Sequence, residues 1–214
     1  MDPASTRMKF PTTNILRVES ARAGGDGLND FLSLYWRAIY AYIRRSGHDR
    51  AAAADLAQGF VLSRIVEGDL LKTFDPDKGS LRSYIKQSLV WYLRNEHRHA
   101  TAKRRHPERM TGTDLDELPV EEPDSGDSPE AAFDRRYEAD RLDRALGKVR
   151  GYCLERGMGV HWAMFEAWVL KRAMGNGEFA DLTELAAQHG VENAEKASAM
   201  IRTVRRRVMA AMGE

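Results

Sequence analysis

Cysteine is nearly absent from the chain: among its 214 residues there is one, Cys153. A single cysteine cannot form an internal disulfide and excludes the multi-cysteine patterns that bind structural zinc, so we expect a protein of the reducing cytosol. No histidine stands beside Cys153 in the sequence, and we interpret it as a buried helical residue rather than a nucleophile. The six histidines lie mostly in basic stretches with scattered carboxylates, so we expect no metal site and no cofactor.

Long apolar runs are missing as well. Residues 1–20 lack the unbroken apolar core of a signal peptide, and no later stretch approaches the ~20 apolar residues of a membrane span. We expect neither export nor insertion into a membrane. The hydrophobic residues that are present, 43% of the chain, recur at helical spacing and form no convincing strand, which predicts an all-α fold.

The net charge of +1 conceals a strong segregation of charge along the chain. Residues 35–109 carry 15 Lys or Arg against 8 Asp or Glu, residues 111–140 carry 2 against 11, and residues 141–214 carry 12 against 9. Two basic blocks of +7 and +3 therefore flank an acidic block of −9. Basic blocks neutralise phosphates and release counterions, so this order fits two nucleic-acid contacts joined by a segment that avoids them. Solvated helix faces would explain the charges equally well.

Composition along the chain predicts two small helical domains joined by a linker. Residues 107–129 hold four prolines and most of the acidic block, with few bulky apolar residues to offset the cost of ordering. The predicted layout is an N-terminal extension over 1–27, loose apart from a short helix near 15–23, a helical domain over 28–106, a flexible acidic linker over 107–127 and a second helical domain over 128–214.

Capping residues and turns define the expected helix boundaries. Asp49 can cap a helix that stops near Gly68, and Ser80 can cap a long helix after the turn at 75–79. The expected helices cover about 28–47, 50–65, 81–105, 129–146, 162–172, 182–189 and 194–212. The last two are separated by a break at Gly190 and a cap at Asn193, which predicts a helix-turn-helix.

The expected helix over 81–105 has two different faces. Its packing face should contain Leu81, Ile85, Ser88, Leu89 and Tyr92. Its opposite face contains Ser83, Lys86, Gln87, Val90, Arg94, His97, Arg98 and Thr101. Tyr84 and Trp91 lie at the border, where an aromatic ring can stack on an unpaired base while nearby cations bind phosphates. The alternative is that both rings complete the hydrophobic core.

The last expected helix is also amphipathic. Its inward stripe contains Ala197, Met200, Ile201, Val204, Val208 and Met212, and its outward face contains Glu195, Ala199, Arg202, Thr203 and Arg206. A recognition helix places its N-terminal half against base edges in the major groove, where Arg reads guanine and small residues allow close approach. The alternative is a generic helix with solvated arginines; the capped start and the preceding turn favour DNA binding.

Two sets of motifs resemble those of one protein family. The segments DLAQGF at 55–60, FDPDKGSLRSYI at 74–85 and AKRR at 102–105 are similar to region two of an extracytoplasmic-function RNA polymerase sigma factor. The segments SPEAAFDRR at 128–136, LAAQHG at 185–190 and VRRR at 204–207 are similar to region four, in the style of planctomycete members. Trp91, Asn95 and Thr203 stand where many members have Asn, Asp and Arg, which affects the expected promoter sequence more than the activity.

The resemblance implies promoter DNA and core RNA polymerase as partners, and no catalysis. The resemblance implies that the chain binds the clamp helices of the largest polymerase subunit and the flap region of the polymerase. It also allows an anti-sigma protein as a further partner. Residues expected to contact the clamp helices are Asp55, Gln58 and Phe60. Those expected to grip and open the minus-ten element, with a base flipped at the loop-side end, are Arg82, Tyr84, Lys86, Trp91, Arg94 and Arg98. Those expected to read the minus-thirty-five element are Glu195, Lys196, Ala199, Arg202 and Arg206.

Two other functions compete with this interpretation. The stretch from Arg94 to His99 fits the short Arg-polar-x-x-x-His pattern of helical HEPN ribonucleases, in which Arg would bind the scissile phosphate and His99 would transfer protons. A helix-turn-helix repressor would instead bind duplex DNA tightly without polymerase. The sigma-factor interpretation accounts for both halves of the chain, and we favour it over either alternative.

Overall fold

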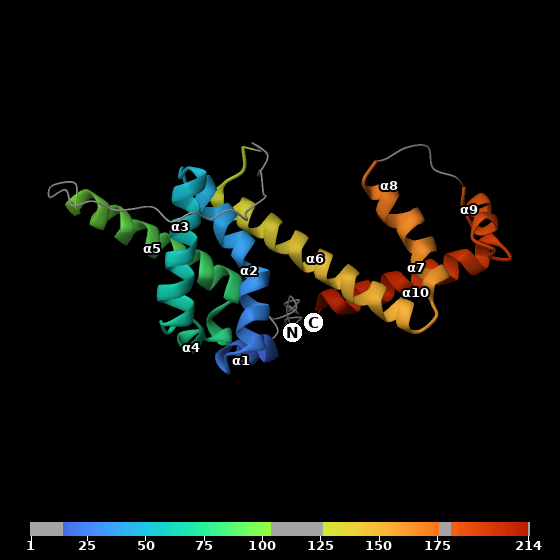
Figure 1. The fold of residues 1–214 in the computed structure, drawn as a ribbon, viewed down its shortest axis with the longest axis horizontal. Coiled ribbons are helices and arrows are strands. Elements are labelled where there is room, and N and C mark those ends of the chain that lie inside the picture. Colours follow the sequence, from blue (N-terminus) through green and yellow to red (C-terminus); the bar gives the residue numbers. More distant parts are fainter. Residues whose placement is uncertain (1–14, 104–125, 176–180, 214) are drawn as a thin grey trace, which may run out of the picture. The chain divides into compact units, whose positions relative to one another are not determined.

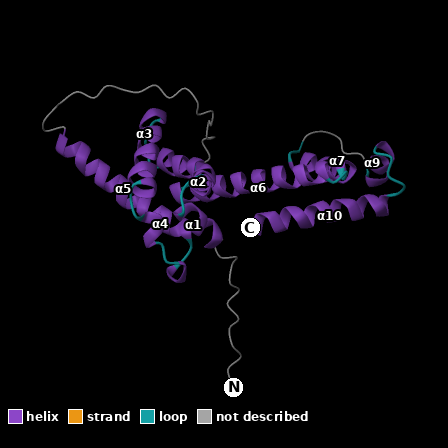
Figure 2. Ribbon diagram, turned by 60° about the horizontal axis from the view of Figure 1, so that its bottom comes forward, coloured by secondary structure: helices purple, strands orange, loops and turns teal. Residues whose placement is uncertain are grey.

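The computed structural model describes residues 15–103, 126–175 and 181–213. Every element in these ranges is a helix, which confirms the predicted all-α class (Figure 2). No helix within the same ranges is both long and apolar enough to cross a membrane. The chain divides into two compact units between Glu138 and Ala139, inside one long helix. Residues 107–125, most of the predicted acidic linker, lie outside the described residues.

The first unit is built from helices and short helical turns (Figure 1), and side-chain caps start some of them. Its elements are α1 (Ile15–Arg22), α2 (Asp26–Arg45), α3 (Arg50–Phe60), a π-helical turn η1 (Val61–Val66), α4 (Leu70–Thr73), a 3-10 turn η2 (Pro76–Lys78), α5 (Leu81–Lys103) and the start of α6 (Pro129–Glu155). The Asp49 carboxylate accepts from the Ala52 amide at 2.8 Å, and the Ser80 hydroxyl accepts from the Ser83 amide at 3.2 Å. Both predicted caps are confirmed, since each satisfies an amide that the first helical turn leaves unpaired.

The core of the first unit forms around α2, which is buried along most of its length. The largest fully buried side chains around it are Phe31, Leu34, Tyr35, Ile39, Ile43, Phe60, Leu81, Ile85, Leu89 and Phe133. The predicted packing face of α5 is therefore confirmed. The N-terminal extension is packed where it is described, because Val18 and Ala21 of α1 are buried against this core. Two small apolar residues are too few to produce a readable helical period, so the sequence did not predict this packing.

The first unit also includes residues 129–138 of α6, although the predicted boundary lay at residue 128. Phe133 and Tyr137, one helical turn apart, pack against Tyr35 of α2 with ring centroids 6.4 Å and 5.0 Å away. Burial of two aromatic side chains against α2 fixes this part of α6 to the first unit. The sequence motif at 128–136 marks the start of a helix correctly but does not mark the start of a unit.

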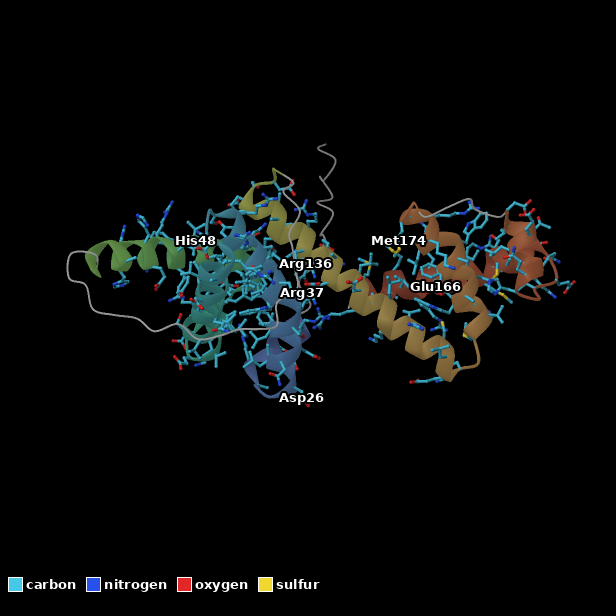
Figure 3. The ribbon with its side chains drawn as sticks, turned by 45° about the horizontal axis from the view of Figure 1, so that its top comes forward. Asp26, Arg37, His48, Arg136, Glu166 and Met174 are labelled. Carbon is cyan, nitrogen blue, oxygen red and sulfur yellow. The ribbon has the colours of Figure 1, made fainter. Side chains whose placement is uncertain are left out.

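The second unit contains the rest of α6 followed by shorter helices. These are α7 (Gly159–Phe165), a π-helical turn η3 (Glu166–Leu170), α8 (Lys171–Ala173), α9 (Leu182–Gln188) and α10 (Ala194–Gly213). Cys153 is fully buried in its core, as predicted, and burial raises the pKa of its thiol. Met174 at the end of α8 is in contrast 67% exposed (Figure 3).

The predicted inward stripe of α10 is confirmed. Ala197, Ile201, Val204 and Val208 are buried, and Met200 and Met212 pack partly buried against the same core. The turn before α10 has Gly190 in the left-handed region with φ 68°, which explains why the helical pattern breaks there. The Asn193 side chain then accepts from the Lys196 amide at 2.8 Å and starts the helix as predicted.

Candidate nucleic-acid interface

One side of α5 presents an aromatic ring and cations to solvent. Trp91 is 56% exposed, and the Arg94 guanidinium lies 5.8 Å from the centroid of its ring. Arg98, one turn further along α5, is exposed as well. The alternative that Trp91 completes the core is therefore wrong. We call the side formed by Tyr84, Gln87, Trp91, Arg94 and Arg98 the aromatic face of α5. The C-terminal end of α5 extends beyond the rest of its bundle (Figures 1 and 2).

A pocket of about 290 Å³ opens at the N-terminal end of the aromatic face. Its lining residues are Thr73, Phe74, Asp75, Lys78, Gly79, Ser80, Ser83, Tyr84 and Gln87. Tyr84 is half-buried in its wall: the Tyr84 and Thr73 hydroxyl oxygens are 2.9 Å apart, and the Tyr84 ring centroid lies 5.8 Å from that of Phe74. The pocket thus combines an aromatic wall with hydroxyl, amide and charged groups.

The turn DPDKGS forms the rim of this pocket through local interactions. Asp75 accepts from the Asp77 amide at 3.0 Å and pairs with Lys78 at 3.2 Å. The backbone hydrogen bond from Asp77 and, to a smaller extent, the hydrogen bond from Lys78 lower the pKa of the Asp75 carboxyl. Asp75 is therefore ionised at neutral pH. Pro76 restricts its own φ, and Gly79 has φ 145°, a conformation that other residues rarely adopt. The sequence of the turn therefore determines the shape of the rim.

Arg22 of α1 supports the pocket from outside and was not predicted. Its Nε donates to the Leu71 carbonyl oxygen at 2.9 Å, and its Nη2 donates to the Phe74 carbonyl oxygen at 2.9 Å. These two hydrogen bonds fix α4 through Leu71 and the pocket wall through Phe74. The contacts span about fifty positions of sequence, and no local pattern could have indicated them.

Arg82 and Lys86 lie on a different side of α5 from Trp91, which corrects their predicted grouping with the aromatic face. Arg82 Nη1 is 2.7 Å from Glu138 Oε1, and Lys86 Nζ is 2.7 Å from Asp134 Oδ2. The Lys86 side chain is 19% exposed because α6 covers it. These two cations already have carboxylate partners, whereas Arg94 and Arg98 face solvent. The helical spacing of α5 could not predict which cations remain exposed, because that depends on which side of α5 is covered by α6.

The residues predicted to bind polymerase divide between surface and core. Asp55 and Gln58 are exposed on α3, but Phe60 is fully buried, with its ring centroid 5.5 Å from that of Tyr92, so Phe60 cannot contact a partner directly. On the next turns, Leu62 and Val66 are 52% and 47% exposed. We call Asp55, Gln58, Leu62 and Val66 the α3 strip.

The π-helical turn η1 changes which residues after Phe60 are buried. In a regular helix Arg64 would follow Phe60 on the buried side after four residues. The wider turn instead buries Ile65, five residues after Phe60, and leaves Arg64 exposed. Burial is therefore shifted by one position, from 64 to Ile65, and Leu62 and Val66 remain on the surface.

The α10 residues predicted to read duplex DNA are all exposed: Glu195, Lys196, Ala199, Arg202 and Arg206. The spacing of four, three and four residues between Glu195, Ala199, Arg202 and Arg206 places these four on one side of the helix, which we call the outward face of α10. Lys196 lies beside it and pairs with Glu192. Among the described residues, Arg202 makes one long contact, 3.4 Å, with the Ser198 hydroxyl. The small side chain of Ala199 leaves the helix surface open between Glu195 and Arg202.

Arg94 and His99 of the ribonuclease pattern are both exposed on α5 and lie five residues apart, about 140° around the helix axis. Among the described residues, no group of three or more His, Cys, Asp or Glu side chains could hold a metal ion.

Comparison with protein-family models, with curated proteins and with solved structures finds no match to the chain. The functional assignment therefore depends on the motifs and on the geometry of the candidate surfaces.

Proposed function

We propose that this chain is a sigma factor that binds core RNA polymerase in the cytosol and directs initiation at specific promoters, with no catalytic reaction of its own. The main support is that one chain combines two candidate nucleic-acid surfaces of different kinds. The aromatic face of α5 suits an opened strand, and the outward face of α10 suits a closed duplex. A protein that both recognises and opens a promoter needs one surface of each kind.

The aromatic face supports strand capture through its exposed ring and its pocket. Trp91 offers a surface on which an unpaired base can stack, and Arg94 and Arg98 can bind the adjoining phosphates. The pocket beside Tyr84 lies at the loop-side end of α5, where the family resemblance implies a flipped base. Its mixture of aromatic and polar groups suits a nucleobase, whose faces are apolar and whose edges form hydrogen bonds.

The outward face of α10 supports duplex recognition. Arg202 and Arg206 can donate bidentate hydrogen bonds to guanine in the major groove, and Ala199 permits close approach to the bases. The compact α9 and the glycine turn precede α10 in the order that a helix-turn-helix requires. Exposed arginines such as Arg202 and Arg206 fit duplex recognition better than cations that already pair with carboxylates of the protein.

The α3 strip supports docking on polymerase, because two exposed apolar side chains adjoin polar ones on a helix. We propose the clamp helices of the largest subunit as the surface that it meets, and the flap region as the contact of the second unit. Buried Phe60 would act indirectly, by holding α3 against α5.

Run-off transcription with core polymerase and a promoter library tests the proposal. We expect initiation at a defined subset of templates, and only when the protein is added. Tight, sequence-specific binding to duplex DNA by the protein alone, without any stimulation of transcription, would identify a repressor. RNA degradation that disappears in His99→Ala would identify a ribonuclease.

A further inference from the structure

Residues 129–138 of α6 carry a regular row of carboxylates that faces α2 and α5. Glu130, Asp134 and Glu138 follow one another at intervals of four residues, on one side of the helix. Each accepts a hydrogen bond from one of these two helices: Glu130 from the Tyr42 hydroxyl at 3.2 Å, Asp134 from Lys86 at 2.7 Å and Glu138 from Arg82 at 2.7 Å. The row is therefore matched donor by donor to α2 and α5.

Aromatic rings accompany the two charged pairs. The Arg82 guanidinium lies 5.0 Å from the centroid of the Tyr137 ring, and the Lys86 ammonium lies 5.8 Å from that of Phe133. Each cation thus meets a carboxylate and a π system together. A nucleotide offers the same combination, a phosphate anion beside the face of a base.

We propose that residues 129–138 act as an internal substitute for single-stranded nucleic acid and compete with it for Arg82 and Lys86. When this segment is docked, nucleic acid reaches only the solvent-facing cations of α5. When the segment leaves, two further phosphate-binding groups become available on the side of α5 that it covered. The inference rests on the proposed function, since it assumes that α5 binds an opened strand. It adds that the chain restricts this binding through its own helix.

The test compares two full-length variants in binding to a fluorescein-labelled single-stranded oligonucleotide of mixed sequence. Asp134→Asn with Glu138→Gln frees both cations. Glu130→Gln is the matched control: it removes a charge from the same row, but its partner Tyr42 carries no charge at neutral pH, since burial and then Glu130 raise the pKa of Tyr42 to about 12. Both charged pairs are partly exposed, so they contribute little to stability and both variants should fold.

The salt dependence of affinity gives the expected magnitude. Each phosphate contact with a single strand adds about 0.7 to the slope of log affinity against log salt, so two freed cations should steepen it by about 1.4. The affinity advantage of the double variant over the wild type should then grow about sevenfold between about 200 mM and about 50 mM salt. Glu130→Gln should keep the wild-type slope. Adding Lys86→Gln and Arg82→Gln to the double variant should abolish the gain.

Three results would overturn the inference. The salt-dependence slope of the double variant could equal that of the wild type. Glu130→Gln could steepen the slope as much as the double variant does. The gain in affinity could also survive the removal of Lys86 and Arg82. If the double variant fails to fold, Glu138→Gln alone should give about half the change in slope, and no change would be equally decisive. Loss of binding in Trp91→Ala with no effect of the α6 variants would leave the proposed function standing without this inference. A gain in affinity of the double variant without any promoter-specific transcription would support this inference and contradict the proposed function.

Discussion

The two units use their basic helices in opposite ways. In the first unit, α5 is packed on two sides: its apolar face against the core, and Arg82 and Lys86 against α6. In the second unit, α10 is buried along one stripe, and Arg202 and Arg206 face solvent. A helix that shapes a pocket must be fixed from several directions, whereas a helix that enters a groove needs one buried side. The first unit also buries more aromatic side chains than the second.

The largest expected effect concerns the part of α6 that belongs to the first unit. Phe133→Ala should destabilise that unit by about 3–5 kcal/mol, because a fully buried ring is replaced by a cavity. Thermal unfolding followed by circular dichroism checks this, with Leu142→Ala as a control on the exposed side of the same helix. Equal melting temperatures for the two variants would contradict the division of the chain at residue 138.

A second test concerns the aromatic face of α5. Trp91→Ala should reduce strand opening on a promoter by about 1–3 kcal/mol per stacked base, measured as permanganate reactivity. Because Trp91 is largely exposed, the melting temperature should stay close to that of the wild type. Closed-complex affinity should also remain. Normal opening by the folded variant would remove Trp91 from the melting role.

A third test concerns the outward face of α10. Arg206→Ala should weaken recognition of closed promoter duplex by about 1–3 kcal/mol if its contact with a base is bidentate, and the defect should shrink on a pre-melted template. Arg207→Ala is the matched control, because the Arg207 guanidinium lies 4.2 Å from the centroid of the Tyr152 ring inside the second unit. Equal defects in binding to closed duplex would indicate that α10 acts only through its total charge.

The smallest effects should come from two helical glycines that distinguish tight from open packing. A Cβ at Gly59 of α3 would lie 2.4 Å from the Tyr92 hydroxyl oxygen, whereas a Cβ at Gly147 of α6 meets nothing within 4 Å. Gly147→Ala should therefore stabilise the second unit by up to about 1 kcal/mol through helix propensity. Gly59→Ala should destabilise the first unit by about 1 kcal/mol, since overpacking outweighs the same gain. Chemical denaturation measures both.

Tyr92→Phe provides the internal control for Gly59→Ala. Removing the hydroxyl removes the atom that the new methyl group would contact, so the double variant should recover the lost stability. A Gly59→Ala protein as stable as the wild type would show that α3 and α5 have room to separate.

Features determined by the sequence alone are those that act over one or two helical turns. The caps at Asp49 and Asn193, the break at Gly190 and the buried stripe of α10 were all predicted and confirmed. Each depends on hydrogen bonds or side-chain spacing within a few residues, where the sequence and the geometry correspond directly. The exposure of the outward face of α10 follows from the same period.

Tertiary structure alone decided which cations of α5 remain available. Helical spacing separates a buried side from an exposed one, but it cannot show that a segment some fifty residues later covers Arg82 and Lys86 and leaves Arg94 and Arg98 in solvent. The support of the pocket by Arg22 and the division of the chain within α6 have the same origin. Each depends on contacts between distant segments, whose partners are selected by packing and charge complementarity and leave no periodic signal in the sequence.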